Sequence, residues 1–87
     1  MMVVTVRSYV MLPNASPDFR LGRPFQVQLD EGTTLSQLTD HVLAIPPGEV
    51  ALAAVDGRLV DEQYLLKTQE RVDIFPPIMG GSGGFRL

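Results

Sequence analysis

The sequence predicts a single α+β domain, with a mixed sheet of four to five strands and one main helix packed across it. Three features of the chain support this prediction. Two early segments alternate apolar and polar side chains, as half-buried strands do. A middle segment has apolar residues at helical spacing directly after a helix-capping pattern. The second half of the chain then has short apolar runs separated by turn residues, which indicates further strands.

The first two strands are predicted at residues 2–12 and 25–30. The first has apolar side chains on one face, interrupted by Ser8, and more polar side chains on the other. The second reads Phe-Gln-Val-Gln-Leu-Asp and alternates at every position. Residues 13–24 between them are rich in turn-forming residues. We therefore expect a long surface loop that joins two antiparallel strands.

A helix is predicted to begin after Thr34 and to end by about Ala44. Thr34 is the expected N-cap, and Gln37, three residues later, is the reciprocal partner of a capping box. Pro46 disfavours helical geometry at the residue before it, which sets the end of the helix. The apolar residues that are expected to cover the sheet are Leu35, Leu38, Val42 and Ile45.

Three more strands are predicted in the second half of the chain, at residues 50–55, 58–60 and 72–75. Asp56-Gly57 is a strong two-residue turn signal between the first two of them. The order strand, strand, helix, strand, short strand, final strand matches the β-grasp, or ubiquitin-like, roll. In that roll the first and last strands lie parallel in the middle of the sheet. A helix at residues 50–55, which the alanines there permit, would remove a strand and contradict this fold.

The amino-acid composition and net charge of the chain argue against several classes of function. The chain has 87 residues and no cysteine, so a disulfide framework, a thiolate metal site and a cysteine nucleophile are excluded. The formal net charge of −3 argues against binding nucleic acid through its phosphates. His41, the one histidine, has no second ligand at metal-binding spacing, and no G-x-x-x-x-G-K-[ST] loop is present, so we expect no bound metal or cofactor. The chain has neither a membrane-length apolar run nor a signal-peptide pattern, so we expect a cytoplasmic location and no membrane partner.

Residues 72–81 read Val-Asp-Ile-Phe-Pro-Pro-Ile-Met-Gly-Gly and are suited to project a chain end. The two prolines end the last strand and leave it stiffly extended, because each lacks a backbone N–H and has a fixed φ. The two glycines have no Cβ and can enter a narrow site on another protein. We expect the folded domain to span residues 1–78 and a flexible, glycine-rich C-terminal tail to span residues 79–87.

This ending resembles that of the MoaD/ThiS family of sulfur carriers, which are small relatives of ubiquitin. Residues 74–81, Ile-Phe-Pro-Pro-Ile-Met-Gly-Gly, are similar to the terminal signature of the family. Two further segments are similar to the family in the same order, Asp-Glu-Gly-Thr-Thr-Leu at 30–35 and Val-Asp-Gly-Arg at 55–58. The resemblance covers residues 2–81. The length to Gly81 and the double proline are closest to the MoaD branch, the small subunit of molybdopterin synthase.

The resemblance implies a carrier protein rather than an enzyme, one that can act as the non-catalytic small subunit of a synthase. Its terminal glycine, Gly81, would be adenylated with ATP by an activating enzyme of the ubiquitin-activating type. A sulfur donor protein would convert the adenylate to a thiocarboxylate. The large subunit of molybdopterin synthase, or another sulfur-accepting enzyme, would then receive the sulfur. Gly80 would keep the channel around Gly81 clear, and the residues implied to dock partners are Phe75, Pro76, Pro77, Ile78 and Met79.

One departure from the family bears directly on this mechanism. Residues 82–87, Ser-Gly-Gly-Phe-Arg-Leu, follow Gly81, which therefore has no free carboxylate. A milder departure is Gln-Glu-Arg at residues 69–71, where the family usually has Gly-Asp. Three explanations of the extra residues remain open. A peptidase removes residues 82–87, or Gly84 beside Gly83 is the functional end, or the glycine-rich segment is a linker-like tail on a domain that carries nothing.

Two alternative functions also remain open at this point. The first is a sulfur carrier that serves thiamin, cysteine or another sulfur-containing metabolite. The second is a ubiquitin-like interaction module that performs no covalent chemistry. Only a carrier requires a free glycine carboxylate, so the state of the C-terminal residues separates the two classes.

Overall fold

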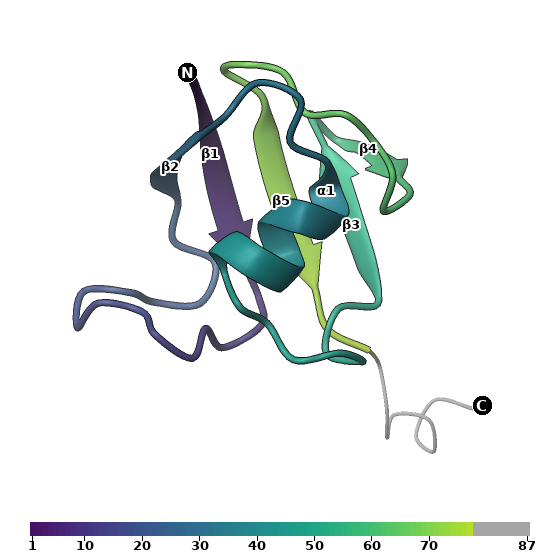
Figure 1. Cartoon of the computed structure of the whole chain (residues 1–87). Helices are drawn as coiled ribbons and strands as arrows, with labels where there is room; N and C mark the ends of the chain where they lie inside the picture. The colour runs from purple at the N-terminus through teal and green to yellow at the C-terminus, as the bar shows by residue number, and fades with distance from the viewer. Residues whose placement is uncertain (78–87) are drawn as a thin grey trace.

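The computed structural model describes residues 1–77, which form one five-stranded mixed sheet with a helix across one face (Figure 1). The strands are β1 (Met2–Ser8), β2 (Phe25–Leu29), β3 (Leu52–Val55), β4 (Arg58–Val60) and β5 (Arg71–Phe75). The helix combines α1 (Leu35–Gln37) with η1 (Leu38–Val42). The order across the sheet is β2-β1-β5-β3-β4. The predicted α+β fold with its β-grasp element order is confirmed, and residues 50–55 contribute a strand rather than a helix.

Some of the residues for which the sequence makes predictions lie after residue 77. The expected tail at 79–87 and Ile78, the last residue of the expected domain, lie outside the described residues. Within residues 1–77, no helix has both the length and the apolar character needed to cross a membrane.

The strands β1 and β5 lie parallel in the middle of the sheet, as predicted. β1 also pairs antiparallel with β2, and β5 pairs antiparallel with β3, where Leu52 is opposite Phe75. Two further backbone hydrogen bonds hold the end of β5: the N–H of Tyr9 donates to the oxygen of Ile74 (2.8 Å), and the N–H of Ala51 donates to the oxygen of Phe75 (2.9 Å). The last strand is therefore held from both sides up to its final residue.

The strand β1 is shorter than the predicted residues 2–12, because the side chain of Ser8 ends it. The Oγ of Ser8 donates to the backbone oxygen of Val10 (2.6 Å) and accepts from the N–H of Val10 (3.0 Å). These bonds occupy backbone groups that a continuing strand would offer to a neighbour. Ser8 is fully buried, and Val10 remains part of the core.

The helix begins as predicted and then changes its hydrogen-bonding period. The Oγ1 of Thr34 accepts from the N–H of Gln37 (3.2 Å), and the Oε1 of Gln37 accepts from the N–H of Thr34 (3.0 Å), so the capping box is present. In η1 the chain forms a π-helical turn, in which the N–H of Leu43 donates to the oxygen of Leu38 (2.8 Å), five residues back.

This wider turn moves the apolar face of the helix by one residue. Leu38 is followed in the core by Leu43, whereas Val42 is 48% exposed. The prediction that Val42 covers the sheet is therefore wrong, because it assumed a regular 3.6-residue period through the whole segment. Ala44 then adopts a positive φ of 53°, and this left-handed residue ends the helix.

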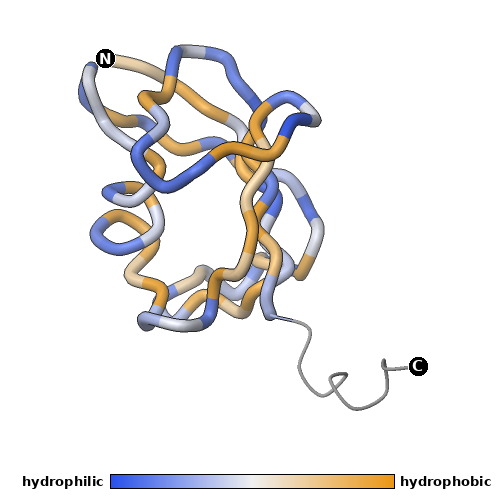
Figure 2. Tube along the Cα trace, turned by 90° about the vertical axis from the view of Figure 1, so that its right-hand side faces the viewer, coloured by the Kyte–Doolittle hydropathy of each residue, from blue (hydrophilic) through white to orange (hydrophobic). Residues whose placement is uncertain are grey.

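The hydrophobic core lies between the helix and the inner face of the sheet. In Figure 2 the two coils of the helix lie to one side of the strands, with apolar segments along the strands that face them. The central strands supply the most deeply buried side chains, including Val4 and Val6 from β1 and Val72 and Ile74 from β5, all with 0% exposure. The complete burial of these four side chains stabilises the pairing of β5, near the end of the chain, with β1, near its beginning.

The outer face of β5 carries an ion pair with β1, in which Asp73 is buried. Arg7 is the register partner of Asp73. Its Nε donates to Oδ1 of Asp73 (2.8 Å) and its Nη2 donates to Oδ2 (3.0 Å). This two-pronged contact satisfies both carboxylate oxygens and joins the two central strands across the face opposite the helix. The half-buried strand that the alternation predicts thus has one buried residue, Asp73, on its polar side as well.

The connection from β4 to β5 contains a second polar pair. The hydroxyl of Tyr64 donates to Oε2 of Glu70 (2.5 Å), and the N–H of Lys67 donates to Oε1 of the same carboxylate (2.7 Å). The hydrogen bond to Glu70, followed by desolvation and by the charge of Glu70, raises the pKa of Tyr64 above its ordinary value of 10.0.

We expect Leu43→Ala to lower the free energy of unfolding by about 2–5 kcal/mol, because it leaves a cavity in the core. Val42→Ala, its neighbour and matched control, is expected to cost less than about 0.5 kcal/mol, because that side chain already contacts water. Urea unfolding of the two variants measures both changes. Equal losses would contradict the shifted face of the helix.

We expect the contribution of Tyr64 to stability to be lost in alkali. The folded state keeps the phenolic proton at a pH where the unfolded state releases it, so the contribution is complete below about pH 10 and decreases as pH rises through the higher folded pKa. Absorbance titration of the phenolate, together with unfolding measured against pH, follows both effects. Tyr64→Phe should remove a phenol that ionises above pH 10, and removal of a phenol that ionises at or below about pH 10 would overturn the assignment.

Candidate functional site

The candidate site is the end of β5, where the chain leaves the sheet (Figure 1). Phe75 is the last residue of the strand, and Pro76 and Pro77 follow it in exposed positions. Neither proline has a backbone N–H to offer a neighbouring strand, so sheet pairing cannot continue. The chain is therefore held firmly up to Phe75 and then directed away from the sheet.

The side chain of Phe75 lies on the outer face of the sheet. Ile74 points into the core, and successive side chains of a strand point to opposite faces. The ring of Phe75 stacks on the ring of Tyr9, with centroids 5.2 Å apart and planes inclined by 3°. Such a pair adds roughly 0.5–1.5 kcal/mol beyond its buried area and limits the orientation of both rings.

Two leucines extend this apolar surface across the neighbouring strands. Leu52 of β3 is the register partner of Phe75 and is 51% exposed. Leu59 of β4 is the register partner of Ala54 and is 67% exposed. We call the following four residues the outer apolar patch: Tyr9, Leu52, Leu59 and Phe75. In the described part of the chain the helix covers the opposite face, so the patch is open, and exposed apolar patches of this kind mark interaction surfaces.

The ion pair between Arg7 and Asp73 lies on the same face as the outer apolar patch. Asp73 precedes Phe75 by two residues, so the two side chains point to the same side of β5. The Asp73 carboxylate raises the pKa of Arg7 above its ordinary value, first through their hydrogen bond and then through its charge. A partner that docks here therefore meets apolar side chains beside a fixed, ionised pair, a mixture typical of protein interfaces.

The structure describes only some of the residues that the sequence assigned to the site. Phe75, Pro76 and Pro77 are described, and they lie together beside the outer apolar patch. The others lie outside the described residues, and they are Ile78, Met79, Gly80, Gly81, Gly83 and Gly84.

Sequence reasoning missed three residues of the patch, Tyr9, Leu52 and Leu59. Alternation along the first strand does place Tyr9 on the face away from the core. The signal was insufficient because the pattern of one strand does not show which strand lies beside it. Within residues 1–77, no group of three or more His, Asp or Glu side chains is placed to hold a metal ion, and His41 is exposed on η1.

Comparison with known proteins identifies relatives of this fold. The family model described as the ThiS family matches residues 15–81. The chain resembles the structure of a putative molybdopterin converting factor, subunit 1, from Pyrococcus furiosus, with a TM-score of 0.59, 20% identity, and coverage of 90% of this chain and 100% of that one. It also resembles SAMP1 from Haloferax volcanii, with a TM-score of 0.63, 14% identity, and coverage of 91% of this chain and 99% of that one. No curated protein matches the chain.

The two structural likenesses establish the fold, and the family model extends the evidence to the sequence. Its match begins in the loop between β1 and β2, continues through the helix and β5, and ends at Gly81. It therefore includes the Phe-Pro-Pro exit and the first pair of glycines but not residues 82–87. The chain belongs to the ThiS family of ubiquitin-like sulfur carriers.

Proposed function

We propose that this protein is a sulfur carrier whose reactive end is Gly81, exposed as a free carboxylate after residues 82–87 are removed. In this role the chain is a co-substrate of other enzymes and not itself a catalyst. The observation that best supports the proposal is the exit from β5. The strand is held between β1 and β3, ends in Phe-Pro-Pro beside the outer apolar patch, and leads to a family match that stops at Gly81.

The chemistry starts with a free carboxylate. A peptidase hydrolyses the bond between Gly81 and Ser82, so that water leaves its oxygen on Gly81 and a proton on the new amine of Ser82. A carboxylate is a poor electrophile, so an activating enzyme joins it to the AMP portion of ATP and releases pyrophosphate. A sulfur donor protein then delivers sulfide (HS⁻), whose sulfur attacks the carbonyl carbon of the acyl-adenylate. The bond to AMP breaks, AMP departs, the proton of the sulfide passes to water, and Gly81 bears a thiocarboxylate. ATP is bound by the activating enzyme, and this chain binds neither cofactor nor metal.

The contribution of the carrier is positioning. Because β1 and β3 hold β5 as far as Phe75, the folded domain fixes the point from which the chain end enters an enzyme, which reduces the entropic cost of each encounter. The outer apolar patch would dock the activating enzyme and the sulfur-accepting enzyme in turn. Gly80 and Gly81 then present no side chains to a narrow channel.

We further propose that the acceptor is the large subunit of a molybdopterin synthase and that the exchange takes place in the cytoplasm, where ATP is available. The support is the likeness to a putative molybdopterin converting factor subunit, together with the double proline and the length to Gly81. A carrier for thiamin or another metabolite is the second candidate, because the matching family model is that of ThiS.

The chain isolated from its own cells is expected to end at Gly81, in part with one carboxylate oxygen replaced by sulfur. Intact mass spectrometry measures both features. With the activating enzyme, a chain ending at Gly81 should support exchange between ATP and pyrophosphate, and the full-length chain should not.

A chain ending at Gly84 is the matched control for this experiment. Exchange with this control, and none with the chain ending at Gly81, would move the reactive residue to Gly84. If residues 82–87 stay in place in cells and neither shortened chain is adenylated, the interaction module becomes the better account.

In the chain ending at Gly81, Leu59→Ser is expected to raise the KM of the activating enzyme for this chain about fivefold, which corresponds to the loss of about 1 kcal/mol of docking free energy. Leu21→Ser is the control, because Leu21 is 55% exposed but lies in the loop between β1 and β2. Equal KM values for the two variants, with unchanged melting temperatures, would exclude the outer apolar patch as the docking surface.

A further inference from the structure

A groove with a volume of about 550 Å³ lies between the helix, the loop that follows it and the strands β3 and β4. Its lining combines buried or half-buried apolar side chains with exposed carboxylates. We call it the acidic groove, and the residues that matter here are Ile45, Val50, Val60, Asp40, Asp61 and Glu62. Such a groove suits an occupant that carries a positive charge between apolar groups.

Within residues 1–77, no cation neutralises the three carboxylates of the acidic groove. Asp40 accepts a hydrogen bond from the hydroxyl of Ser36 (3.2 Å), and Asp61 accepts one from the N–H of Gln63 (2.9 Å). These neutral donors do not cancel a charge. Within residues 1–77, no basic side chain lines the groove or forms an ion pair with these carboxylates. The groove therefore attracts a cation that this part of the chain does not supply.

The acidic groove lies directly beside the point where the chain leaves β5. Ala51 and Leu52, which line the groove, also hold the last residue of the strand. The N–H of Ala51 donates to the oxygen of Phe75 (2.9 Å), and Leu52 is the register partner of Phe75. The chain therefore leaves β5 next to β3, the strand whose first residues line the groove.

The following ten residues, 78–87, contain one charged side chain, Arg86, which stands between Phe85 and Leu87. Phe85 lies eight positions after Pro77 along the chain, a span of up to about 28 Å when fully extended. A glycine-rich segment of that length has a mean end-to-end distance of roughly 16 Å. The sequence order apolar, cationic, apolar matches the lining of the acidic groove, and the segment is long enough to reach it.

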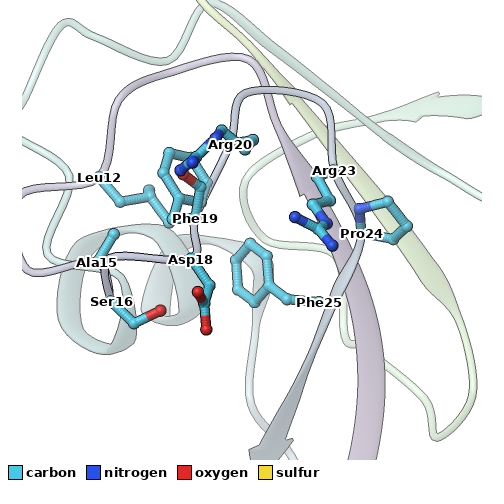
Figure 3. Close-up of a pocket in the computed structure, with 9 residues that line it drawn as sticks. All are labelled: Leu12, Ala15, Ser16, Asp18, Phe19, Arg20, Arg23, Pro24 and Phe25. Carbon is cyan, nitrogen blue, oxygen red and sulfur yellow. The ribbon is translucent and has the colours of Figure 1, made fainter.

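A second cavity in the described chain is a poorer match. It lies against the edge-to-face pair of Phe19 and Phe25, and Figure 3 shows Arg20 and Arg23 among its lining residues. Two guanidinium groups and one carboxylate, that of Asp18, give it a net positive lining, which repels a third guanidinium. Charge therefore favours the acidic groove as the site for Arg86.

We propose that the acidic groove binds Phe85-Arg86-Leu87 of the same chain as long as residues 82–87 remain attached. Because the segment is tethered, its effective concentration at the groove is on the order of 1 mM, so a weak intrinsic affinity suffices. Hydrolysis after Gly81 removes the tether, and the released peptide dissociates. The docking is argued from the groove and the sequence alone, whereas its loss on cleavage after Gly81 rests on the proposed function.

Amide chemical shifts of the full chain and of a chain ending at Gly81 test the docking without any partner protein. We expect shift differences at Val50, Val60 and Glu62 that are clearly larger than those in β2 or its preceding loop. Arg86→Glu in the full chain should abolish these differences, while Arg86→Lys should retain them in part. Raising salt from about 0.05 M to about 1 M should reduce them, because the pairing is electrostatic.

Neutral variants of the groove provide the matched control. In a full chain that carries Asp61→Asn and Glu62→Gln, Arg86 has lost its carboxylate partners. Adding Arg86→Glu to that chain should therefore cause no further change in the amide shifts of the groove. Asp18→Asn with Glu31→Gln, which removes two exposed carboxylates elsewhere, should leave it intact.

Three results would overturn the proposal. The first is coincident spectra over residues 1–75. The second is shift differences confined to the outer apolar patch or to the cavity in Figure 3. The third is differences that depend on protein concentration, which would indicate a second copy as the occupant. The adenylation of the chain ending at Gly81 involves none of residues 82–87, so failure of the docking leaves the proposed function standing, and failure of adenylation leaves the docking standing.

Discussion

The parallel pairing of β1 with β5 is the constraint on which the rest of this structure depends. It brings residues 2–8 and 71–75 together in the middle of the sheet, and every other strand is added outside this pair. The inner face of the pair is closed by the buried valines and Ile74, and the ion pair of Arg7 with Asp73 links the two strands across the outer face. The consequence of this pairing is that Phe75, at the exit, is one of the best-held residues near the end of the chain.

The proposed function uses the firm hold that the sheet has on β5. Catalysis by a partner requires the reactive carbonyl to be placed within a fraction of an ångström, and a strand fixed on both sides provides the reference point for that placement. The outer apolar patch begins at the same residue, because the stack of Tyr9 on Phe75 continues into Leu52. Docking and delivery therefore share one end of the sheet.

The helix and the loop after it form the surface on the other side of the chain exit from the outer apolar patch. Its π-helical turn exposes Val42 and buries Leu43, and the left-handed Ala44 then reverses the chain toward β3. Ile45 returns to the core, and the loop after it forms a wall of the acidic groove. A local departure from regular helical geometry thus places a charged groove and an apolar surface on either side of the chain exit. Unusual helical turns of this type are often found at functional sites.

Local patterns in the sequence were enough to predict the element order, the capping box of Thr34 with Gln37, the Asp56-Gly57 turn and the stiff Phe-Pro-Pro exit. Each of these depends on the backbone preferences of a few neighbouring residues, or on the period at which apolar side chains recur. Tertiary structure alone decided the partners, such as Arg7 with Asp73, which are 66 positions apart, and Tyr9 with Phe75. The tertiary structure also decided that the side chain of Val42 faces solvent. The physical reason is that alternation shows which side of a strand is apolar, whereas strand order, register and helix phase are set by how the whole chain buries its core.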